Sequence, residues 1–232
     1  SLEEPVGNYV PHFKEANLDK VRIVDLLTMS SGTNYQEFDK SYFSMNAYGY
    51  YGDNEEYMVN KMVFKEPSGT YWDYRSGDTQ VLGLVVEKAF GDNISNLVSE
   101  RFLQPMGAEV DAVWLLDGDQ KHEKAFCCFN ATARDYARVG QALMSGDPKI
   151  ASTSWKARLS TPSVKLDYGW GYGAQMWHPY AGINLMLGLH GQYIYQDALH
   201  DTVIVKLSDM PTSADGISVK VAAVLKEIAE KN

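Results

Sequence analysis

The chain has 232 residues, of which 45% are hydrophobic and 22% are charged, values that are ordinary for a globular protein of one or two domains. Its formal net charge of -9 argues against a nucleic-acid-binding surface, which requires clustered Lys and Arg, and against binding to an anionic membrane. The longest apolar run covers residues 81–86 and is far too short to span a bilayer. We therefore expect no nucleic-acid partner and no membrane span in this chain.

The first 105 residues are predicted to be mainly helical. Four segments show helical spacing of apolar residues or capping signals, at residues 18–29, 53–63, 79–90 and 93–105. For the third of these helices, Ser76 or Asp78 is the expected N-cap and Gly91 the expected C-cap. Residues 33–52 are rich in Tyr, Asn and Gly and are predicted to be a long ordered loop, either lining a pocket or covering the core.

Strands dominate the last third of the sequence. Short strands are predicted at residues 112–116 and 125–129, and longer ones follow at residues 171–177, 183–187, 192–196 and 202–207. Thr132 and Asp135 resemble a capping box ahead of a helix that runs to Ser145, and residues 213–231 form a closing helix. This order indicates an α+β protein, with a mainly helical region at 1–165 and an antiparallel sheet plus C-terminal helix at 166–232.

The two cysteines of the chain, Cys127 and Cys128, are adjacent. Successive side chains of a strand point to opposite faces, and a bridge between neighbours is strained. We therefore expect both to be reduced packing residues without a metal or redox role. The five histidines are scattered without ligand spacing, so no metal site and no cofactor is expected.

Three segments carry the strongest functional signal. They read Asp-Leu-Leu-Thr-Met-Ser-Ser-Gly at 25–32, Tyr-Arg-Ser-Gly-Asp-Thr-Gln-Val-Leu-Gly at 74–83, and Gly-Leu-His-Gly-Gln-Tyr-Ile-Tyr at 188–195. In this order they resemble the serine β-lactamase and penicillin-binding-protein superfamily, and in particular its class C-like branch of esterases, D-aminopeptidases and 6-aminohexanoate-oligomer hydrolases. The resemblance implies a β-lactamase/transpeptidase-like α+β fold in which a helical region lies beside an antiparallel sheet flanked by helices. The N-terminal strands and the nucleophile helix of that fold are absent from this chain, which would form one continuous catalytic domain with them.

The resemblance also implies roles for individual residues. Tyr74 takes the place of the general base, and the N–H group of Gln192 that of an oxyanion donor. Ser76, which stands where the family often has Asn, is an expected substrate-binding residue. His190 and Gly191 are expected on the strand that lines the substrate, with the motif triplet either Leu189-His190-Gly191 or His190-Gly191-Gln192. Trp177 is expected either to wall the pocket or to pack in the core.

The family's nucleophile is the Ser of a Ser-x-x-Lys motif, and no Ser of this chain is followed by Lys at that spacing. We therefore expect the motif on an N-terminal segment of the same protein that precedes Ser1. The implied function is hydrolysis of a small ester or amide, with β-lactams as a less favoured substrate, through an acyl-enzyme on that serine.

Two alternatives remain open from the sequence. One is a catalytically inactive binding protein that keeps the fold, and the other is a peptidoglycan DD-carboxypeptidase or transpeptidase. The sequence does not indicate a localisation. Only the resemblance to the family suggests a bacterial enzyme that is periplasmic or secreted.

Overall fold

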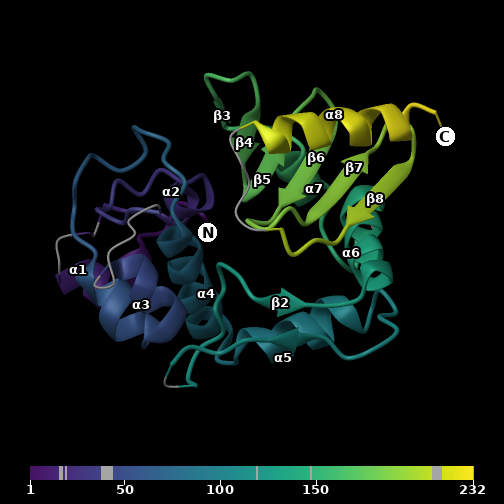
Figure 1. Ribbon diagram of the computed structural model, residues 1–232. Helices are drawn as coiled ribbons and strands as arrows, with labels where there is room; N and C mark the ends of the chain where they lie inside the picture. Colours follow the sequence, from purple (N-terminus) through teal and green to yellow (C-terminus); the bar gives the residue numbers. More distant parts are fainter. Residues whose placement is uncertain are drawn as a thin grey trace. The chain divides into compact units, whose positions relative to one another are not determined.

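The computed structural model describes residues 1–15, 18, 20–37, 44–118, 120–146, 148–210 and 216–231. The chain forms two compact units (Figure 1), one containing Ser1–Ser99 and Val113–Asn130, the other containing Glu100–Ala112 and Ala131–Asn232. No helix of the described residues is both long and apolar enough to cross a membrane. Helices with short strands in the first unit and an antiparallel sheet with helices in the second confirm the predicted α+β class.

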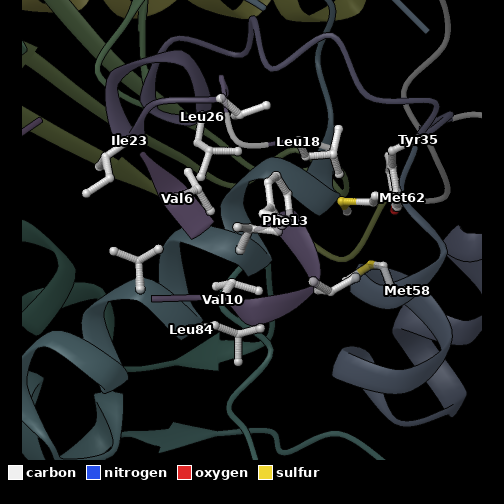
Figure 2. Packing of buried hydrophobic residues seen from close by; sticks show 14 residues of the cluster. Val6, Val10, Phe13, Leu18, Ile23, Leu26, Tyr35, Met58, Met62 and Leu84 are labelled. Carbon is white, nitrogen blue, oxygen red and sulfur yellow. The ribbon is translucent and has the colours of Figure 1, made fainter. Parts of the chain in front are cut away.

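The first unit is built from short helices around one longer helix, α4 (Ser76–Phe90). Its other elements are η1 (Val6–Asn8), α1 (Pro11–Glu15), α2 (Ile23–Leu27), α3 (Met45–Tyr51), η2 (Asn54–Met58), η3 (Val59–Lys61), α5 (Ile94–Val98), β1 (Val113–Trp114) and β2 (Phe129–Asn130). Figure 2 shows the apolar core on which α1, α2 and α4 converge, with Phe13, Leu26 and Leu84 among its members. Burial of this core stabilises helices that are too short to persist alone.

Helix α4 ends as predicted but does not begin as predicted. Gly91 is left-handed, with φ +70°, and donates its N–H to the carbonyl of Glu87, which confirms the C-cap. The N-cap is Arg75, which makes no side-chain capping bond, so the expected cap by Ser76 or Asp78 is wrong. Both side chains instead bond to residues distant in the sequence, Glu37 and Ser31, and are therefore not available for local capping.

Two other helical predictions differ from the structure. The helix expected at residues 18–29 is shorter in the structure, where α2 covers Ile23–Leu27 and Met29 turns the chain beyond it with φ +56°. The loop expected at residues 33–52 contains helix α3, although positions 38–43 lie outside the described residues. Gly49 of α3 lies against Met58 and Phe126, so tertiary packing supports a helix whose residues have low helix propensity.

The expectation of two reduced cysteines is wrong, because Cys127 and Cys128 form a disulfide. The predicted strand at 125–129 is a turn through Cys127, and β2 begins only at Phe129. Cys128 has φ +68°, which is left-handed and not extended. The rule that strand neighbours point to opposite faces therefore does not hold at this pair.

The second unit is a six-stranded antiparallel sheet with the strands in sequence order. The strands are β3 (Val164–Lys165), β4 (Gly171–Gly173), β5 (Met176–His178), β6 (Ile183–Leu187), β7 (Tyr193–Asp197) and β8 (Thr202–Lys206). Its helices are η4 (Ser99–Leu103), which begins at the last residue of the first unit, α6 (Ala133–Ser145), α7 (Thr153–Leu159) and α8 (Ile217–Ala229). The strand predicted at 171–177 is a hairpin, because Ala174 and Gln175 form a tight turn with φ +50° and +63°.

Helices α6 and α8 cover opposite faces of the β7–β8 part of the sheet. Gly140 of α6 approaches Ile194 and Val203, whereas Tyr195, which points to the other face, interacts with Glu230 at the end of α8. Thr132 caps α6 by accepting the N–H of Asp135, as predicted. The part of the sheet that follows the third motif segment is therefore covered on both faces.

Candidate functional site

The candidate residues fall into two groups, one in each compact unit. Tyr74 and Ser76 lie in the first unit, at the start of α4. Trp177, His190, Gly191 and Gln192 lie in the second unit, on β5 and in the turn between β6 and β7.

Tyr74 is half-buried, two residues ahead of α4. Burial raises the pKa of its phenol to about 12, and the nearby Glu37 and Tyr50 add smaller increases. A phenol with this pKa is protonated at neutral pH. Tyr74 can therefore act as a base only where a cation offsets the effect of burial.

Glu37 is the neighbour of Tyr74 that sequence reasoning missed. Its carboxylate accepts two hydrogen bonds from Ser76, one from the backbone N–H at 2.7 Å and one from Oγ at 2.7 Å. Burial raises the pKa of Glu37, and these two bonds oppose the increase. The only sequence signal was its place in a segment, residues 33–52, that was expected either to line a pocket or to cover the core.

The first two motif segments meet through a buried hydrogen bond. Ser31 donates from Oγ to Oδ1 of Asp78 at 2.6 Å, and both residues are fully buried. Burial raises the pKa of Asp78 to about 7, although the bond from Ser31 and the nearby Arg75 lower it. The Arg75 guanidinium, only 1% exposed, pairs with Asp73 at 3.0 Å. The segment around Tyr74 is thus held by a fully buried Ser31–Asp78 hydrogen bond and by an ion pair whose Arg75 side is buried.

The third motif segment forms a tight turn from β6 into β7. Gly191 has φ +79°, a conformation that favours glycine, and donates its N–H to the Gly188 carbonyl at 3.0 Å. Gly188 in turn donates its N–H to the Gln192 carbonyl at 2.9 Å. Among the described residues, no acceptor pairs with the N–H of Gln192. This leaves one backbone donor at the start of β7 for an incoming oxygen atom.

His190 and Gln192 are fixed by bonds within the same turn. His190 Nδ1 lies 2.8 Å from the Met210 carbonyl, and Gln192 Nε2 donates to the Ser208 carbonyl at 2.9 Å. Lys206 Nζ donates to the Gly191 carbonyl at 2.9 Å, which places a positive charge beside the turn. These bonds join the turn to β8 and to the residues that follow β8.

Trp177 lies on β5, opposite Tyr172 on β4 and Leu185 on β6. Its ring meets the rings of Tyr172 and Trp170 edge to face, with centroids 4.9 Å and 6.2 Å apart. It is half-buried, so one side of the indole is accessible while the other packs in an aromatic cluster.

A cavity of about 590 Å³ in the first unit is lined by none of these residues. Its wall includes Leu84, Glu87 and His122, and the hydrogen bond that the His122 imidazole makes to the Glu87 carboxylate raises the pKa of His122. Within the described part of the chain, no group of three or more His, Cys, Asp or Glu residues could hold a metal ion.

Comparison with known proteins gives consistent matches along the chain. A family model described as Beta-lactamase matches residues 1–225. A 6-aminohexanoate-dimer hydrolase from Paenarthrobacter ureafaciens is 26% identical over 241 residues, which cover 90% of this chain and 59% of that protein.

Solved structures show the same fold. One from Bacillus anthracis, provisionally named a 6-aminohexanoate-dimer hydrolase, has a TM-score of 0.85 at 25% identity and matches 100% of this chain and 66% of its own. A penicillin-binding protein from Bacillus halodurans has a TM-score of 0.73 at 18% identity, over 98% of this chain and 78% of its own. The chain spans less than two thirds of the length of the two 6-aminohexanoate-dimer hydrolases.

Proposed function

Because the chain belongs to the beta-lactamase family, we propose that it is the C-terminal part of a serine hydrolase acting on small esters or amides. The nucleophile is the serine of a Ser-x-x-Lys motif on residues preceding Ser1, and the reaction passes through an acyl-enzyme that water hydrolyses. The observation that supports this most directly is Tyr74, whose phenol lies just ahead of α4 with a pKa that burial raises and with Glu37 and Tyr50 nearby.

Tyr74 is proposed as the general base. Its pKa of about 12 is too high for a base at neutral pH, so the mechanism needs a cation beside the phenol. The Lys of the Ser-x-x-Lys motif would supply that charge and lower the pKa of Tyr74. The phenolate would then take the serine proton and later return it to the leaving group.

Gln192 is proposed as one of the two donors to the oxyanion. Its backbone N–H has no partner among the described residues, and the tight turn at Gly191 holds it in place. An N–H group that is already positioned stabilises negative charge on the tetrahedral intermediate without reorganisation. The backbone N–H of the nucleophilic serine would be the second donor.

The substrate is proposed to be a linear amide or ester. The similarity to the 6-aminohexanoate-dimer hydrolase favours an amide between short-chain units. β-Lactams would use the same acyl transfer, but Ser76 offers a hydroxyl where the family often has an amide, and Glu37 already accepts its hydrogen bond.

The test is to label the full-length protein with a serine-reactive fluorophosphonate and to map the modified peptide by mass spectrometry. We expect one label, on the serine of Ser-x-x-Lys, and hydrolysis of a linear amide or ester that the label abolishes. Stable acylation by penicillin without hydrolysis of linear substrates would favour the DD-carboxypeptidase or transpeptidase. A full-length protein without the motif, taking no label, would be a binding protein with this fold.

A further inference from the structure

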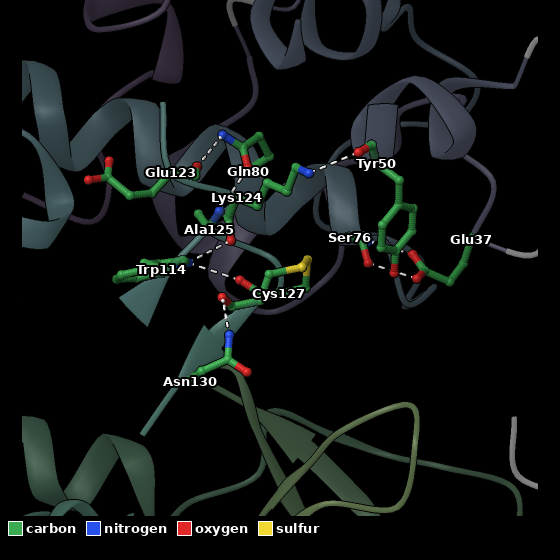
Figure 3. The surroundings of a disulfide bond; sticks show 11 residues. Glu37, Tyr50, Ser76, Gln80, Trp114, Glu123, Lys124, Ala125, Cys127 and Asn130 are labelled. Atoms are coloured by element: carbon green, nitrogen blue, oxygen red, sulfur yellow. Dashed lines mark hydrogen bonds between the residues drawn. A yellow bond between two sulfur atoms is a disulfide. The ribbon is translucent and has the colours of Figure 1, made fainter. Parts of the chain in front are cut away.

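The disulfide between Cys127 and Cys128 lies in the turn that precedes β2 in the first unit (Figure 3). Both cysteines are half-buried, so solvent reaches the pair. The ring that they close contains a single peptide bond, the one between Cys127 and Cys128. The ring restricts the backbone on both sides of that peptide bond. Because Cys128 has φ +68°, unusual for a residue with a side chain, opening the ring would let this residue return to extended backbone.

The backbone at the disulfide is an acceptor for neighbouring side chains. The Cys127 carbonyl accepts the indole N–H of Trp114 at 2.9 Å, and the Cys128 carbonyl accepts Nδ2 of Asn130 at 3.0 Å. The Cys128 carbonyl also accepts the N–H of Leu115 at 3.2 Å. A change of backbone conformation at the ring would therefore break contacts that join the turn to β1.

The same turn holds helix α3 through Tyr50. Lys124 donates from Nζ to the Tyr50 carbonyl at 2.8 Å, and the ring of Phe126 meets that of Tyr50 edge to face, with centroids 5.5 Å apart. Tyr50 in turn lies beside Glu37 and Ser76 in Figure 3, and its phenol interacts electrostatically with Glu37 and Tyr74. The turn that carries the disulfide thus contacts Tyr50, and Tyr50 interacts with Glu37 and Tyr74.

We propose that Cys127–Cys128 is a thiol–disulfide exchange site whose reduction releases Tyr50 from its place beside Glu37 and Tyr74. A dithiol attacks one sulfur as its thiolate, forming a mixed disulfide and one free cysteine. The second thiol of the dithiol then attacks the mixed disulfide and displaces the other cysteine. The disulfide gains two electrons and two protons, and the dithiol becomes a disulfide. The effect on catalysis rests on the proposed function, whereas the exchange and the release of Tyr50 do not.

The experiment uses the full-length protein, purified without reductant and then divided into untreated and dithiothreitol-treated samples. Alkylation and intact mass count the free thiols in each sample. Hydrogen exchange followed by mass spectrometry measures backbone protection at residues 124–130 and at α3, with α6 as an internal control. The double variant Cys127→Ser/Cys128→Ser, which mimics the reduced form, is measured in parallel.

We expect both cysteines to resist alkylation until dithiothreitol is added, and exchange at residues 124–130 and at α3 to become about tenfold faster on reduction. Exchange at α6 should not change, and the double variant should match the reduced protein with or without dithiothreitol. Free thiols before reduction, or unchanged exchange at α3, would overturn the proposal.

Hydrolysis measured on the same samples distinguishes failure of the redox proposal from failure of the proposed hydrolase function. If the protein hydrolyses esters or amides, kcat/KM should fall several-fold on reduction and should not respond to dithiothreitol in the double variant. An equal kcat/KM in both states would overturn the link to the Tyr74 group. If no sample hydrolyses a substrate, the proposed function fails, while the thiol count and α3 exchange still decide the redox proposal.

Discussion

At the scale of single residues, burial is the main influence on ionisation around Tyr74. It raises the pKa of Tyr74 and of two nearby carboxyl groups, Glu37 and Asp78. A phenol that holds its proton as strongly as Tyr74 needs a positive charge beside it to ionise at neutral pH. A cation brought next to Tyr74 would therefore change its protonation more than it would at an exposed site, where water screens the interaction.

The role proposed for Tyr74 gives an expectation for Tyr74→Phe in the full-length protein. Losing the phenol removes the proton acceptor but keeps the ring, so kcat/KM should fall by about 100-fold to 10,000-fold. The matched control is Tyr71→Phe, because Tyr71 is 63% exposed and belongs to no motif segment. Steady-state hydrolysis of a linear amide is the measurement. Full activity in Tyr74→Phe would exclude the phenol as the base.

Asp78 should make stability depend on pH. Its pKa in the folded protein, about 7, lies above the usual 3.8, so the folded state binds more protons than the unfolded chain between pH 4 and 7. The free energy of unfolding should therefore decrease as pH rises through this window, by up to about 4 kcal/mol from this group. Below pH 4 both states are protonated and this cost disappears.

The variant Asp78→Asn tests this expectation, because it keeps an acceptor for Ser31 but cannot ionise. Urea unfolding at pH 4, 6 and 8 should give a smaller decrease for the variant than for the wild type. The variant should be the more stable protein at pH 8 and within about 1 kcal/mol of it at pH 4. If the free energy of unfolding depends on pH in the same way for both proteins, ionisation of Asp78 does not reduce stability.

At the scale of elements, local signals were readable from the sequence and distant contacts were not. Gly91 and Thr132 cap their helices through residues within one turn, so both caps could be predicted. The tight turn at Ala174 lacks the Gly or Asn that usually marks such turns, so its hairpin was missed. Glu37 contacts Ser76 across 39 residues, and nothing in the local sequence indicates that bond.

The cap at Gly91 allows a clean test of an element boundary. A Cβ added there would meet no atom within 4 Å, so Gly91→Ala costs only the left-handed backbone at φ +70°. We expect a loss of about 1 kcal/mol in the free energy of unfolding, measured in urea. Gly91→Asn should lose less, because Asn tolerates this conformation better. Equal stability of all three proteins would show that α4 does not need this cap.

At the scale of the whole molecule, three short segments in order were enough to predict the family and the fold. That the nucleophile lies on residues preceding Ser1, outside this chain, is a proposal. Tyr74 and Gln192 belong to different compact units. The proposed nucleophile would have to serve both. The full-length protein is therefore the form in which activity should be measured.

The edge of the sheet offers a test of how the preceding residues would join this chain. Among the described strands, β3 and β8 are the two edges, and β3 has only two residues. β8 has five residues, four of which have strong β-propensity (Thr202, Val203, Ile204 and Val205), and both faces beside it are covered by α6 and α8. Its outward backbone groups have no strand partner among the described residues and are otherwise left to water, so we expect strands preceding Ser1 to pair there.

Hydrogen exchange of this chain alone and of the full-length protein measures that pairing. In the chain alone, outward amides of β8 should exchange at least about tenfold faster than in the full-length protein, because an unpaired edge amide is open to solvent. β6 lies between two partner strands, so its amides should be protected in both and serve as the control. Equal exchange of β8 in the two proteins would mean that the preceding residues do not extend the sheet at this edge.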